Sequence, residues 1–362
     1  MGEIGECRPE QGWPGRKERG WVLALGVTAP FEPDQGLYGD EVPTQQETPG
    51  KVLEVRRRQT GDCAERPGEV SRHGVFDGVH RGHRLVLGAL DEAPVETKIA
   101  LTFGTHPAQV LSEAGPPPML TSLKERLALL GEAGVDAVAV LDFDADMVAL
   151  TPQEFVEEVL VAGLHARFVA VGEGFRFGHL AEGTTDTLIE LGRVRGFDVA
   201  VVPILNDDGV EIRSTVIRQA VAAGDVERAA SLLGRPYRIT GVVVAGEGRG
   251  ATIGIPTANI SFPANLAVPS RGVYAVYAVI DGSRLPAVAN LGVRPTFGGD
   301  EEVLEVHLLN QELDLTGKEL GVDFATRLRD EQRFDGIEPL VAQIRSDIEA
   351  ARSVLEEIPQ TP

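Results

Sequence analysis

The sequence predicts an α/β domain built on a doubly wound parallel sheet, followed by a small antiparallel β-barrel domain with a C-terminal helix. Two observations predict this order. Between residues 97 and about 205, apolar segments of strand length alternate with helical patterns, which is typical of a parallel sheet covered by helices. From about residue 238, strand patterns follow one another without helical patterns between them, which is typical of a closed barrel. A length of 362 residues also suits two domains better than one.

The first domain alternates short apolar runs with segments that carry apolar residues at helical spacing. In chain order these are strand 98–103, helix 122–133, strand 137–143, helix 152–162, strand 167–171, helix 185–195 and strand 198–205, before a helical stretch at 214–233. Thr151, Pro152 and Glu154 form a capping-box pattern at the start of the second helix. In such a sheet, ligands bind at the carboxyl ends of the strands.

The second domain is predicted from strands separated by turn residues, at 238–245, 273–280, 286–291, 303–309 and 321–326. A final helix is expected to be capped by Asp335, with Glu338 three residues further on. The apolar face of this helix should pack against the barrel, and it consists of Ile337, Leu340, Val341, Ile344 and Ile348. We place the boundary near residues 234–236, so that the domains cover 69–234 and 235–358.

Residues 1–68 are rich in Gly, Pro, Glu and Arg and lack sustained periodicity, so we expect a poorly ordered extension. The segment 69–73 should form the apolar first strand of the sheet, but it contains a single apolar residue. Residues 52–55 are apolar enough to take that place, yet they lie far upstream of the first motif.

Charge and cysteine content exclude several classes of function. The formal net charge of −21 excludes nucleic acid or an anionic membrane as the principal partner. Two cysteines, Cys7 and Cys63, are too few for a disulfide framework and too far apart for a zinc motif, which favours a reducing, cytoplasmic compartment. The apolar stretch 21–27 is too short for an export signal, and no run approaches the length of a transmembrane helix. Nothing in the sequence indicates an oligomeric state.

The first motif lies in a glycine-rich stretch before a predicted helix. Its candidate nucleotide-binding and catalytic residues are Gly74, Phe76, Asp77, His80, Gly82 and His83. Glycines let the backbone approach phosphates, and the start of a helix offers free N–H groups and the positive end of its dipole. Two imidazoles at such a place can donate to a triphosphate and stabilise the departing pyrophosphate. The motif therefore predicts adenylyl transfer.

Ser214, Thr215 and Arg218 form a second candidate phosphate site at the start of a helix. Hydroxyls followed by an arginine suit phosphate binding. An ordinary Ser/Thr helix cap is the alternative.

The barrel carries a glycine-rich loop with Gly246, Gly250 and Gly254, followed by Thr257 and Asn259. Such a loop can wrap phosphates, and residues two apart in an extended segment point the same way. A hydroxyl and an amide oxygen are suitable ligands for Mg²⁺, which predicts a metal–phosphate site.

Taken in order, these motifs resemble the bacterial bifunctional riboflavin kinase/FAD synthetase family over about residues 74–354. Residues 74–83 are similar to its Gly-x-Phe-Asp-Gly-x-His-x-Gly-His motif, and Pro-Thr-Ala-Asn at 256–259 is similar to the signature of its kinases. The resemblance implies a Rossmann-like nucleotidyltransferase domain followed by a kinase barrel. It also implies ATP as co-substrate, and riboflavin, FMN and FAD as substrate and products.

The resemblance further implies roles for single residues. Thr257 and Asn259 would hold Mg²⁺ and ATP, and Glu305 would be the catalytic base that takes a proton from the ribityl hydroxyl. On its own, Glu305 could equally be a solvated glutamate on a strand. The residues implied to contact the flavin are Phe175, Arg294 and Arg329.

The leading hypothesis is an enzyme that phosphorylates riboflavin to FMN with ATP and then adenylylates FMN to FAD. One alternative is a riboflavin kinase with a degenerate front domain, and another is a barrel that binds flavin without turnover. A fragment of an aminoacyl-tRNA synthetase shares the histidine pattern but fits the acidic charge poorly. The chain departs from the family at Gly104, Thr105, Gly174 and Arg213, and together with residues 69–73 these departures predict an FAD synthetase weaker than the kinase.

Overall fold

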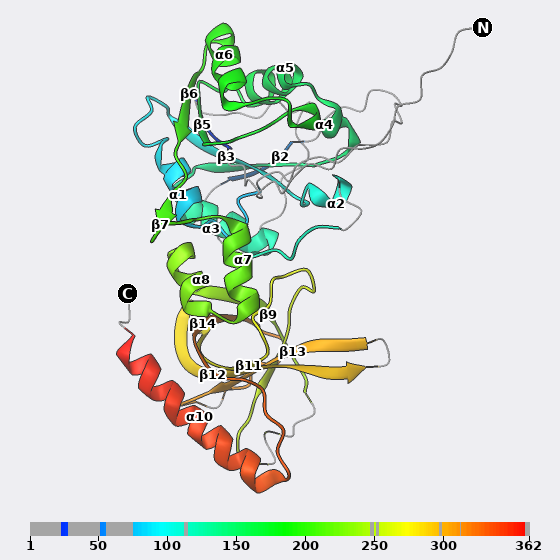
Figure 1. Cartoon of the computed structure of the whole chain (residues 1–362), viewed down its shortest axis with the longest axis vertical. Coiled ribbons are helices and arrows are strands. Elements are labelled where there is room, and N and C mark those ends of the chain that lie inside the picture. The colour runs from blue at the N-terminus through cyan, green and yellow to red at the C-terminus, as the bar shows by residue number, and fades with distance from the viewer. Residues whose placement is uncertain are drawn as a thin grey trace, which may run out of the picture.

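A computed structural model of the chain describes residues 23–27, 51–55, 75–111, 115–246, 250, 253–296, 299–311 and 313–358. A sheet domain covered by helices lies at one end and a closed barrel at the other (Figure 1). Among the described residues, none of the helices has both the length and the apolar character needed to span a membrane.

The sheet has six strands in the order β2-β4-β3-β1-β5-β6. The strands are β1 (Leu23–Val27), β2 (Lys51–Val55), β3 (Thr97–Phe103), β4 (Ala137–Leu141), β5 (Phe168–Gly172) and β6 (Asp198–Val202). Parallel pairing joins β2, β4 and β3, and also β5 and β6. The predicted doubly wound parallel sheet is therefore confirmed, with one difference: β1 lies between β3 and β5 and runs antiparallel to both.

Two segments correct the expectation for residues 1–68. β1 and β2 both come from this range, and both are strands of the sheet. β2 includes residues 52–55, the apolar segment that the sequence offers as a substitute first strand. The apolar run of β1 lies in a polar, Gly- and Pro-rich context and was not predicted as a strand, but five residues suffice to pair with a neighbouring strand. In β1, Ala24 is fully buried opposite the equally buried Ala100 and Ala170. The polar segment 69–73 lies outside the described residues.

Alternating strand residues build two cores, one on each face of the sheet. Leu101 and Val169 pack on one face against a π-helix (Phe155–Gly163) and α6 (Thr185–Arg195). On the other face, Ala100 and Val138 pack against α1 (Arg81–Gly88) and α3 (Leu123–Glu132). The remaining helical elements of the domain are α2 (Ala108–Leu111), α4 (Ala145–Ala149), α5 (Pro152–Glu154), the 3₁₀ turn His179–Ala181, α7 (Ser214–Ala223) and α8 (Val226–Leu233).

The predicted starts of two helices are confirmed. Ser122 caps α3, and Thr151 with Glu154 forms the complete capping box at the start of α5. The predicted helix 152–162 continues past α5 as the π-helix, so its hydrogen-bond spacing differs from the expected one. Between β6 and α7, a short hairpin is made of β7 (Asn206–Asp207) and β8 (Val210–Glu211).

The second domain is a closed barrel in the order β10-β13-β12-β11-β14-β9, with every neighbouring pair antiparallel. Its strands are β9 (Tyr237–Val244), β10 (Ala258–Ser261), β11 (Gly272–Ile280), β12 (Ser283–Thr296), β13 (Gly299–Leu308) and β14 (Glu319–Arg329). The antiparallel barrel is confirmed. The sequence reading missed β10, because this four-residue strand follows a motif that we interpreted only as a ligand site.

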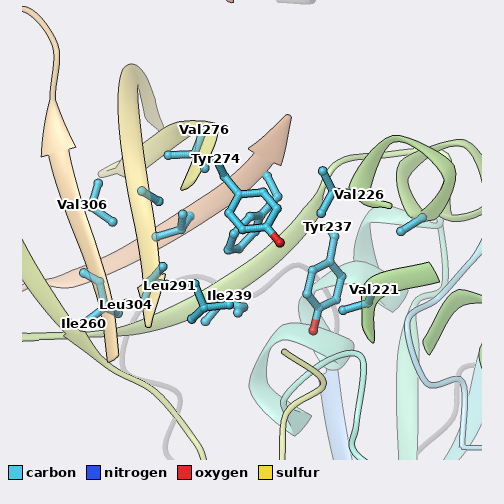
Figure 2. Packing of buried hydrophobic residues seen from close by; sticks show 14 of the residues in the cluster. Val221, Val226, Tyr237, Ile239, Ile260, Tyr274, Val276, Leu291, Leu304 and Val306 are labelled. Carbon is cyan, nitrogen blue, oxygen red and sulfur yellow. The ribbon is translucent and has the colours of Figure 1, made fainter. Parts of the chain in front are cut away.

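One continuous apolar cluster fills the barrel and extends into α7 and α8 (Figure 2). Tyr237 lies between the barrel and Val221 of α7, and its hydroxyl donates to the carbonyl of Ala267. Leu120, from the sheet domain, belongs to the same cluster and is 1% exposed. The two domains therefore share buried apolar surface at their contact.

The C-terminal helix α10 (Ile337–Glu357) packs on the outside of the barrel, as predicted, but two details are wrong. Its N-cap is Gly336 rather than Asp335, and no side chain caps it. The predicted face begins too early: Ile337 is 67% exposed, whereas Ala351 and Leu355 are buried against the barrel. Apolar spacing alone does not reveal where along a helix the contact begins.

Candidate active sites

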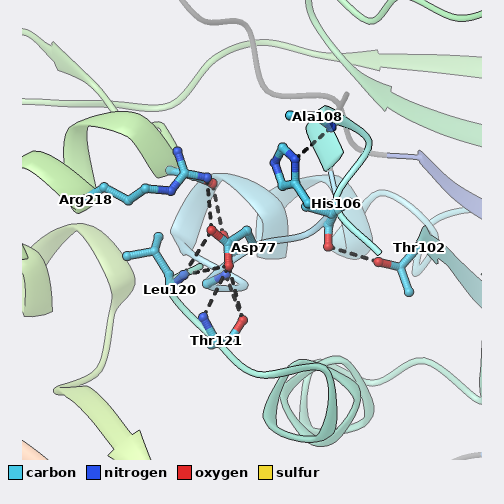
Figure 3. Close-up of polar contacts among 10 residues, drawn as sticks. Asp77, Thr102, His106, Ala108, Leu120, Thr121 and Arg218 are labelled. Carbon is cyan, nitrogen blue, oxygen red and sulfur yellow. Dashed lines mark hydrogen bonds and ion pairs between the residues drawn. The ribbon is translucent and has the colours of Figure 1, made fainter. Parts of the chain in front are cut away.

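The histidine motif forms a tight loop between Val75 and α1. Thr102, near the carboxyl end of β3, donates its hydroxyl to the carbonyl of Val75 over 2.9 Å, so the loop starts at the ligand-binding edge of the sheet (Figure 3). Phe76, Gly78 and Val79 have φ values of 53°, 81° and 37°. Left-handed φ values are unfavourable for the two of these residues that carry a Cβ, so surrounding contacts must hold the loop.

Both histidines are neutral near pH 7. His80 is the N-cap of α1, and its Nδ1 accepts a hydrogen bond of 3.3 Å from the backbone N–H of His83, so the proton of neutral His80 lies on Nε2. Burial lowers the pKa of His80 to about 3, and nearby Arg235 and Arg218 add to this effect. Burial, followed by the charges of His80 and Arg126, also lowers the pKa of His83. Each imidazole therefore offers an N–H group rather than a positive charge.

The two imidazole rings stack, with centroids 3.5 Å apart and planes at 21°. Phe76 meets the His83 ring edge-on at 5.3 Å. A Cβ at Gly82 would lie 3.2 Å from the His80 ring, so glycine leaves room for the stack. Within the described part of the chain, Nδ1 of His83 is buried and has no hydrogen-bond partner.

Asp77 holds the loop from inside. Its carboxylate is 2% exposed and accepts the backbone N–H groups of Leu120 at 2.9 Å and Thr121 at 3.2 Å. The Arg218 guanidinium forms an ion pair with it at 3.0 Å (Figure 3). Ser214 donates its hydroxyl to the carbonyl of Asp77, also at 3.0 Å. The structure thus brings three predicted nucleotide-binding residues together as a support for the histidine loop.

Two other predicted residues are placed differently. Thr215 is the second residue of α7 and is half-buried beside this support. Gly74 lies outside the described residues.

Arg126 is a residue that sequence reasoning missed. Its side chain is 2% exposed in α3, and its Nη2 donates to the carbonyl of Phe103 at the end of β3 over 2.8 Å. Its Nε and Nη1 are buried and have no hydrogen-bond partner in the described part of the chain. Burial lowers its pKa to about 10, so it stays positively charged at neutral pH. The sequence did contain a signal for Arg126: it precedes Leu129 and Leu130 by three and four residues, so it lies on the apolar, buried face of the helix.

Arg235 was predicted only as part of the domain boundary. Its Nη1 donates to the carbonyl of Gly78 over 2.9 Å. A residue that lies just before the first barrel strand therefore contacts the histidine loop. Burial lowers its pKa, while the acidic Glu125 opposes this shift.

The loop after β5 contains the predicted flavin residue Phe175. Phe175 is 6% exposed and stacks on Phe177, with ring centroids 5.5 Å apart. Gly174 has a φ of 85°, which explains why glycine is well suited to this position.

Two other positions at which the chain departs from the family also have defined contacts. Arg213 donates to the Glu211 carboxylate over 2.7 Å. The backbone N–H of Gly104 donates to the carbonyl at the end of β4 over 3.0 Å.

In the barrel, three neighbouring strands bring Asn259, Glu305 and Asn290 side by side. Glu305 in β13 is the register partner of both Asn259 in β10 and Asn290 in β12. The flanking Leu304 and Val306 are 0% and 1% exposed and belong to the barrel core, so Glu305 lies on the outer face. Register partners share a face of the sheet. Asn290 was missed as a site residue because strand pairing is not visible in the sequence.

Glycines let the preceding loop lie directly on this row. A Cβ at Gly246 would lie 2.1 Å from Nδ2 of Asn259, and one at Gly250 would lie 2.3 Å from the carbonyl oxygen of Ile255 and 3.3 Å from Oγ1 of Thr257. Both distances below 3 Å are too short for any side chain. The loop therefore covers Asn259, whose exposure is only 8% although it faces outward.

Gly254 completes the turn with a φ of 76°. His307 donates its Nδ1–H to the carbonyl of Pro256 over 2.7 Å, which fixes the segment just before Thr257. Residues 247–249 and 251–252 of the loop lie outside the described residues.

The two arginines predicted to bind flavin have different outcomes. Arg329 donates to both carboxylate oxygens of Asp347 in α10, with its Nη2 at 2.8 Å, and its guanidinium lies 5.9 Å from the Phe334 ring centroid. Arg329 thus ties the barrel to α10. The side chain of Arg294 is outside what the structure describes.

Comparisons with known proteins match both domains. The riboflavin kinase family matches residues 233–355, and the FAD synthetase family matches residues 63–216. The Escherichia coli K12 bifunctional riboflavin kinase/FMN adenylyltransferase is 42% identical over 293 residues, which are 80% of this chain and 93% of that protein. The Bacillus subtilis protein of the same description is 34% identical over 286 residues, covering 77% and 90% of the two chains.

A solved structure is similar over most of the chain. The crystal structure of a macrolide-efflux protein from Streptococcus pneumoniae aligns with a TM-score of 0.69 at 32% identity, covering 77% of this chain and 92% of that one.

Proposed function

The chain belongs to the family of bifunctional riboflavin kinases/FMN adenylyltransferases, and on that premise we propose which of its residues carry out each reaction. The enzyme phosphorylates riboflavin to FMN and adenylylates FMN to FAD. Matches to both families favour this bifunctional enzyme over a kinase with a degenerate front domain and over a non-enzymatic flavin barrel. The observation that carries the proposal is the alignment of Asn259 and Glu305, together with the close approach of Gly246 to Asn259 and of Gly250 to Thr257.

In the kinase site, Glu305 accepts the proton of the ribityl hydroxyl as that oxygen forms a bond to the γ-phosphorus of ATP. The bond from the γ-phosphorus to ADP breaks in the same displacement. Asn259, the register partner of Glu305 in β10, and Thr257, two residues before Asn259, hold the nucleotide on the same face. The loop from Gly246 to Gly254 approaches the phosphates with its backbone.

The donor set of this site fits magnesium. The described part of the chain contains no cluster of three His, Cys, Asp or Glu side chains that could hold a metal by itself. The hydroxyl of Thr257 and the amide oxygen of Asn259, completed by phosphate oxygens of ATP, are the oxygen ligands that Mg²⁺ prefers. When bound there, the ion would neutralise charge on the phosphates.

In the adenylyltransferase site, His80 and His83 donate N–H groups to the phosphates of ATP. A phosphate oxygen of FMN forms a bond to the α-phosphorus, and the bond to pyrophosphate breaks. Arg126 is suited to hold an anionic phosphate, because it is a buried cation with two guanidinium nitrogens that lack hydrogen-bond partners in the described part of the chain. In this proposal Thr215, near the start of α7, binds phosphate and Phe175 contacts the flavin.

Variants in the two sites test these assignments, because each variant should lose one of the two activities and keep the other. Asn259→Ala or Thr257→Ala should abolish most FMN formation from riboflavin and leave FAD formation from supplied FMN unchanged. His83→Ala should do the reverse. Chromatography of riboflavin, FMN and FAD with Mg-ATP measures both rates on one sample. If either barrel variant kept the wild-type kinase rate at the original half-saturating ATP concentration, the kinase assignment would be wrong.

We also propose a cytoplasmic enzyme whose partners are small molecules. The low cysteine content favours a reducing compartment, and the acidic charge opposes binding to nucleic acid. Fractionation of cells with an antibody against the chain tests the location.

A further inference from the structure

The loop that carries the histidines is held in an unfavourable conformation by groups from several elements. Phe76 and Val79 both have left-handed φ values although both carry a Cβ. Such a conformation persists only when surrounding contacts determine it. His80 follows directly and begins α1, so the conformation of residues 76–79 decides where both imidazoles lie.

Each polar group at the centre of this loop has its own hydrogen-bond partners. The carboxylate of Asp77 binds Leu120, Thr121 and Arg218. Its carbonyl oxygen binds Ser214.

Gly78 is bound on both sides of its peptide. Its N–H donates to Oγ1 of Thr121 at 3.2 Å, and its carbonyl oxygen accepts from Nη1 of Arg235 at 2.9 Å. The first of these contacts comes from the sheet domain. Arg235 is the exception, because it lies inside the segment that matches the riboflavin kinase family and outside the segment that matches the FAD synthetase family.

We propose that Arg235 is a positioning residue for adenylyl transfer, supplied to the FAD synthetase site by the kinase segment of the chain. The inference rests on the proposed role of His80 and His83. Arg235 is hydrogen-bonded to Gly78, two residues before His80, and it is not itself a catalytic residue.

The backbone around Arg235 keeps its guanidinium in place. Gly234 ends α8 with a φ of 77°, and its Cα lies against the side chain of Arg81, where an added Cβ would be 3.0 Å from Cγ. Tyr237, two residues after Arg235, is 1% exposed in the barrel core. The backbone of Arg235 is therefore fixed on both sides, by the end of α8 and by the start of β9.

Charge supports the same placement. Glu125 and Glu132, both on α3, stabilise the positive form of Arg235, while Arg84 and Arg238 oppose it. The positive charge of Arg235 in turn acts on His80 and favours its neutral form. Removing the guanidinium therefore removes both the hydrogen bond to Gly78 and a positive charge that acts on His80.

The test uses full-length Arg235→Met, which keeps the length of the side chain but removes the donor and the charge. Because a misplacement of about 1 Å can cost on the order of a hundredfold in rate, we expect kcat for FAD formation to fall at least about tenfold. KM for ATP and FMN should change less than about twofold, since a transition-state interaction is lost rather than ground-state binding. The rate of FMN formation from riboflavin should stay unchanged. Arg235→Lys should restore part of kcat.

Lys124→Gln is the matched control, because the largely exposed Lys124 also links the domains through an ion pair with Glu319 at 2.7 Å and makes no hydrogen bond to the loop within the described residues. Equal losses in this control would mean that domain contact in general matters, and would overturn the proposal. So would a parallel loss of kinase activity, a rise in KM at constant kcat, or no effect of Arg235→Met in a folded protein. If Arg235→Met does not fold, Arg235→Lys carries the test through the same split between kcat and KM.

A failure of this inference differs from a failure of the site assignment. If His83→Ala leaves FAD formation unchanged, the site itself is misassigned. If His83→Ala abolishes FAD formation while Arg235→Met and Arg235→Lys do not change it, only the role of Arg235 is wrong.

Discussion

At the scale of single residues, the kinase loop depends on glycines whose missing Cβ atoms leave room for other groups. Gly246 lies against the amide of Asn259, and Gly250 lies against the carbonyl of Ile255. The sequence predicts these glycines for phosphate binding. The structure adds a second reason, because the loop must also approach its own site residues.

We expect Gly246→Ala to lower kcat for FMN formation at least about tenfold, because the new Cβ must displace the Asn259 amide and a small misplacement of site groups is costly. FAD formation from supplied FMN should not change. Gly88→Ala is a suitable control, since Gly88 lies in α1 and has open space where a Cβ would be. Wild-type kinase activity of Gly246→Ala would show that the loop moves away from Asn259 without loss.

The buried histidines predict acid sensitivity. The pKa of His80 is lowered from 6.5 to about 3 in the folded protein, so the unfolded chain binds more protons between these values. Stability contributed by the neutral histidine is therefore fully present above pH 6.5 and is lost as the pH falls toward 3. The loss is at most about 1.4 kcal/mol per pH unit for one group.

His80→Gln should therefore lose less stability than the wild type between pH 6.5 and pH 4.5, as measured by urea unfolding at each pH. His165→Gln is the control, because His165 lies on the opposite side of the sheet, just after the π-helix. Identical slopes in wild type and His80→Gln would contradict the buried, neutral state of this imidazole.

At the scale of elements, β1 is the strand that connects the two parallel parts of the sheet. It hydrogen-bonds to β3 on one side and to β5 on the other, so without it the parallel pair β5-β6 has no partner on the side of β3. Ala24 is fully buried where the three strands meet.

We expect Ala24→Asp to destabilise the sheet domain by about 3–5 kcal/mol, because it buries a charge without a partner. FAD formation should be lost, while FMN formation persists in the barrel. Val194→Asp is the control in the same domain, since Val194 is 74% exposed in α6. Calorimetry should show a lower transition for Ala24→Asp only, and a wild-type unfolding profile would contradict the placement of β1.

Deleting residues 1 to about 60 tests both added strands at once. The sequence predicts that FMN formation is nearly unchanged by this deletion, because the segment lacks a periodic apolar face. The structure supports the same outcome for a different reason, since β1 and β2 pair with strands of the sheet domain and not with the barrel. The same pairing adds that FAD formation should be lost. A truncated protein that still makes FAD at the full rate would show that the sheet closes without these strands.

The elements that sequence reasoning found are those with their own periodicity, such as the alternating segments around Leu101 and the barrel strands. β2 contains residues 52–55, which the sequence offers as a substitute first strand. β1 and β10 were missed, because each is a short strand without a neighbouring strand–helix pattern to mark it. The residues of the two candidate sites also fall into those that the sequence could predict and those that it could not. His80, Asp77 and Asn259 belong to local motifs, whereas Arg126, Arg235 and Asn290 join the sites through tertiary contacts and strand register.

At the scale of the whole molecule, the two reactions should run at different rates. The departures at Gly104, Thr105, Gly174 and Arg213 alter polar groups near the nucleotide edge, whereas the barrel motif is nearly intact. Adenylyl transfer depends on fixed donors, so we expect a real FAD synthetase activity that is slower than the kinase. Comparing both initial rates with saturating Mg-ATP measures this directly, and equal rates would contradict it.

The segment 119–121 joins the domains at the level of the backbone. Met119 donates its N–H to the carbonyl of Asn265 and accepts from the N–H of Ala267, each over 2.7 Å. The next two N–H groups in the chain, of Leu120 and Thr121, bind Asp77. Recombining this protein with a relative would therefore fail at the obvious cut near residue 234. A chimera that exchanges only the front half would have to inherit the path of residues 265–267 and Arg235 from the same parent as its histidine loop.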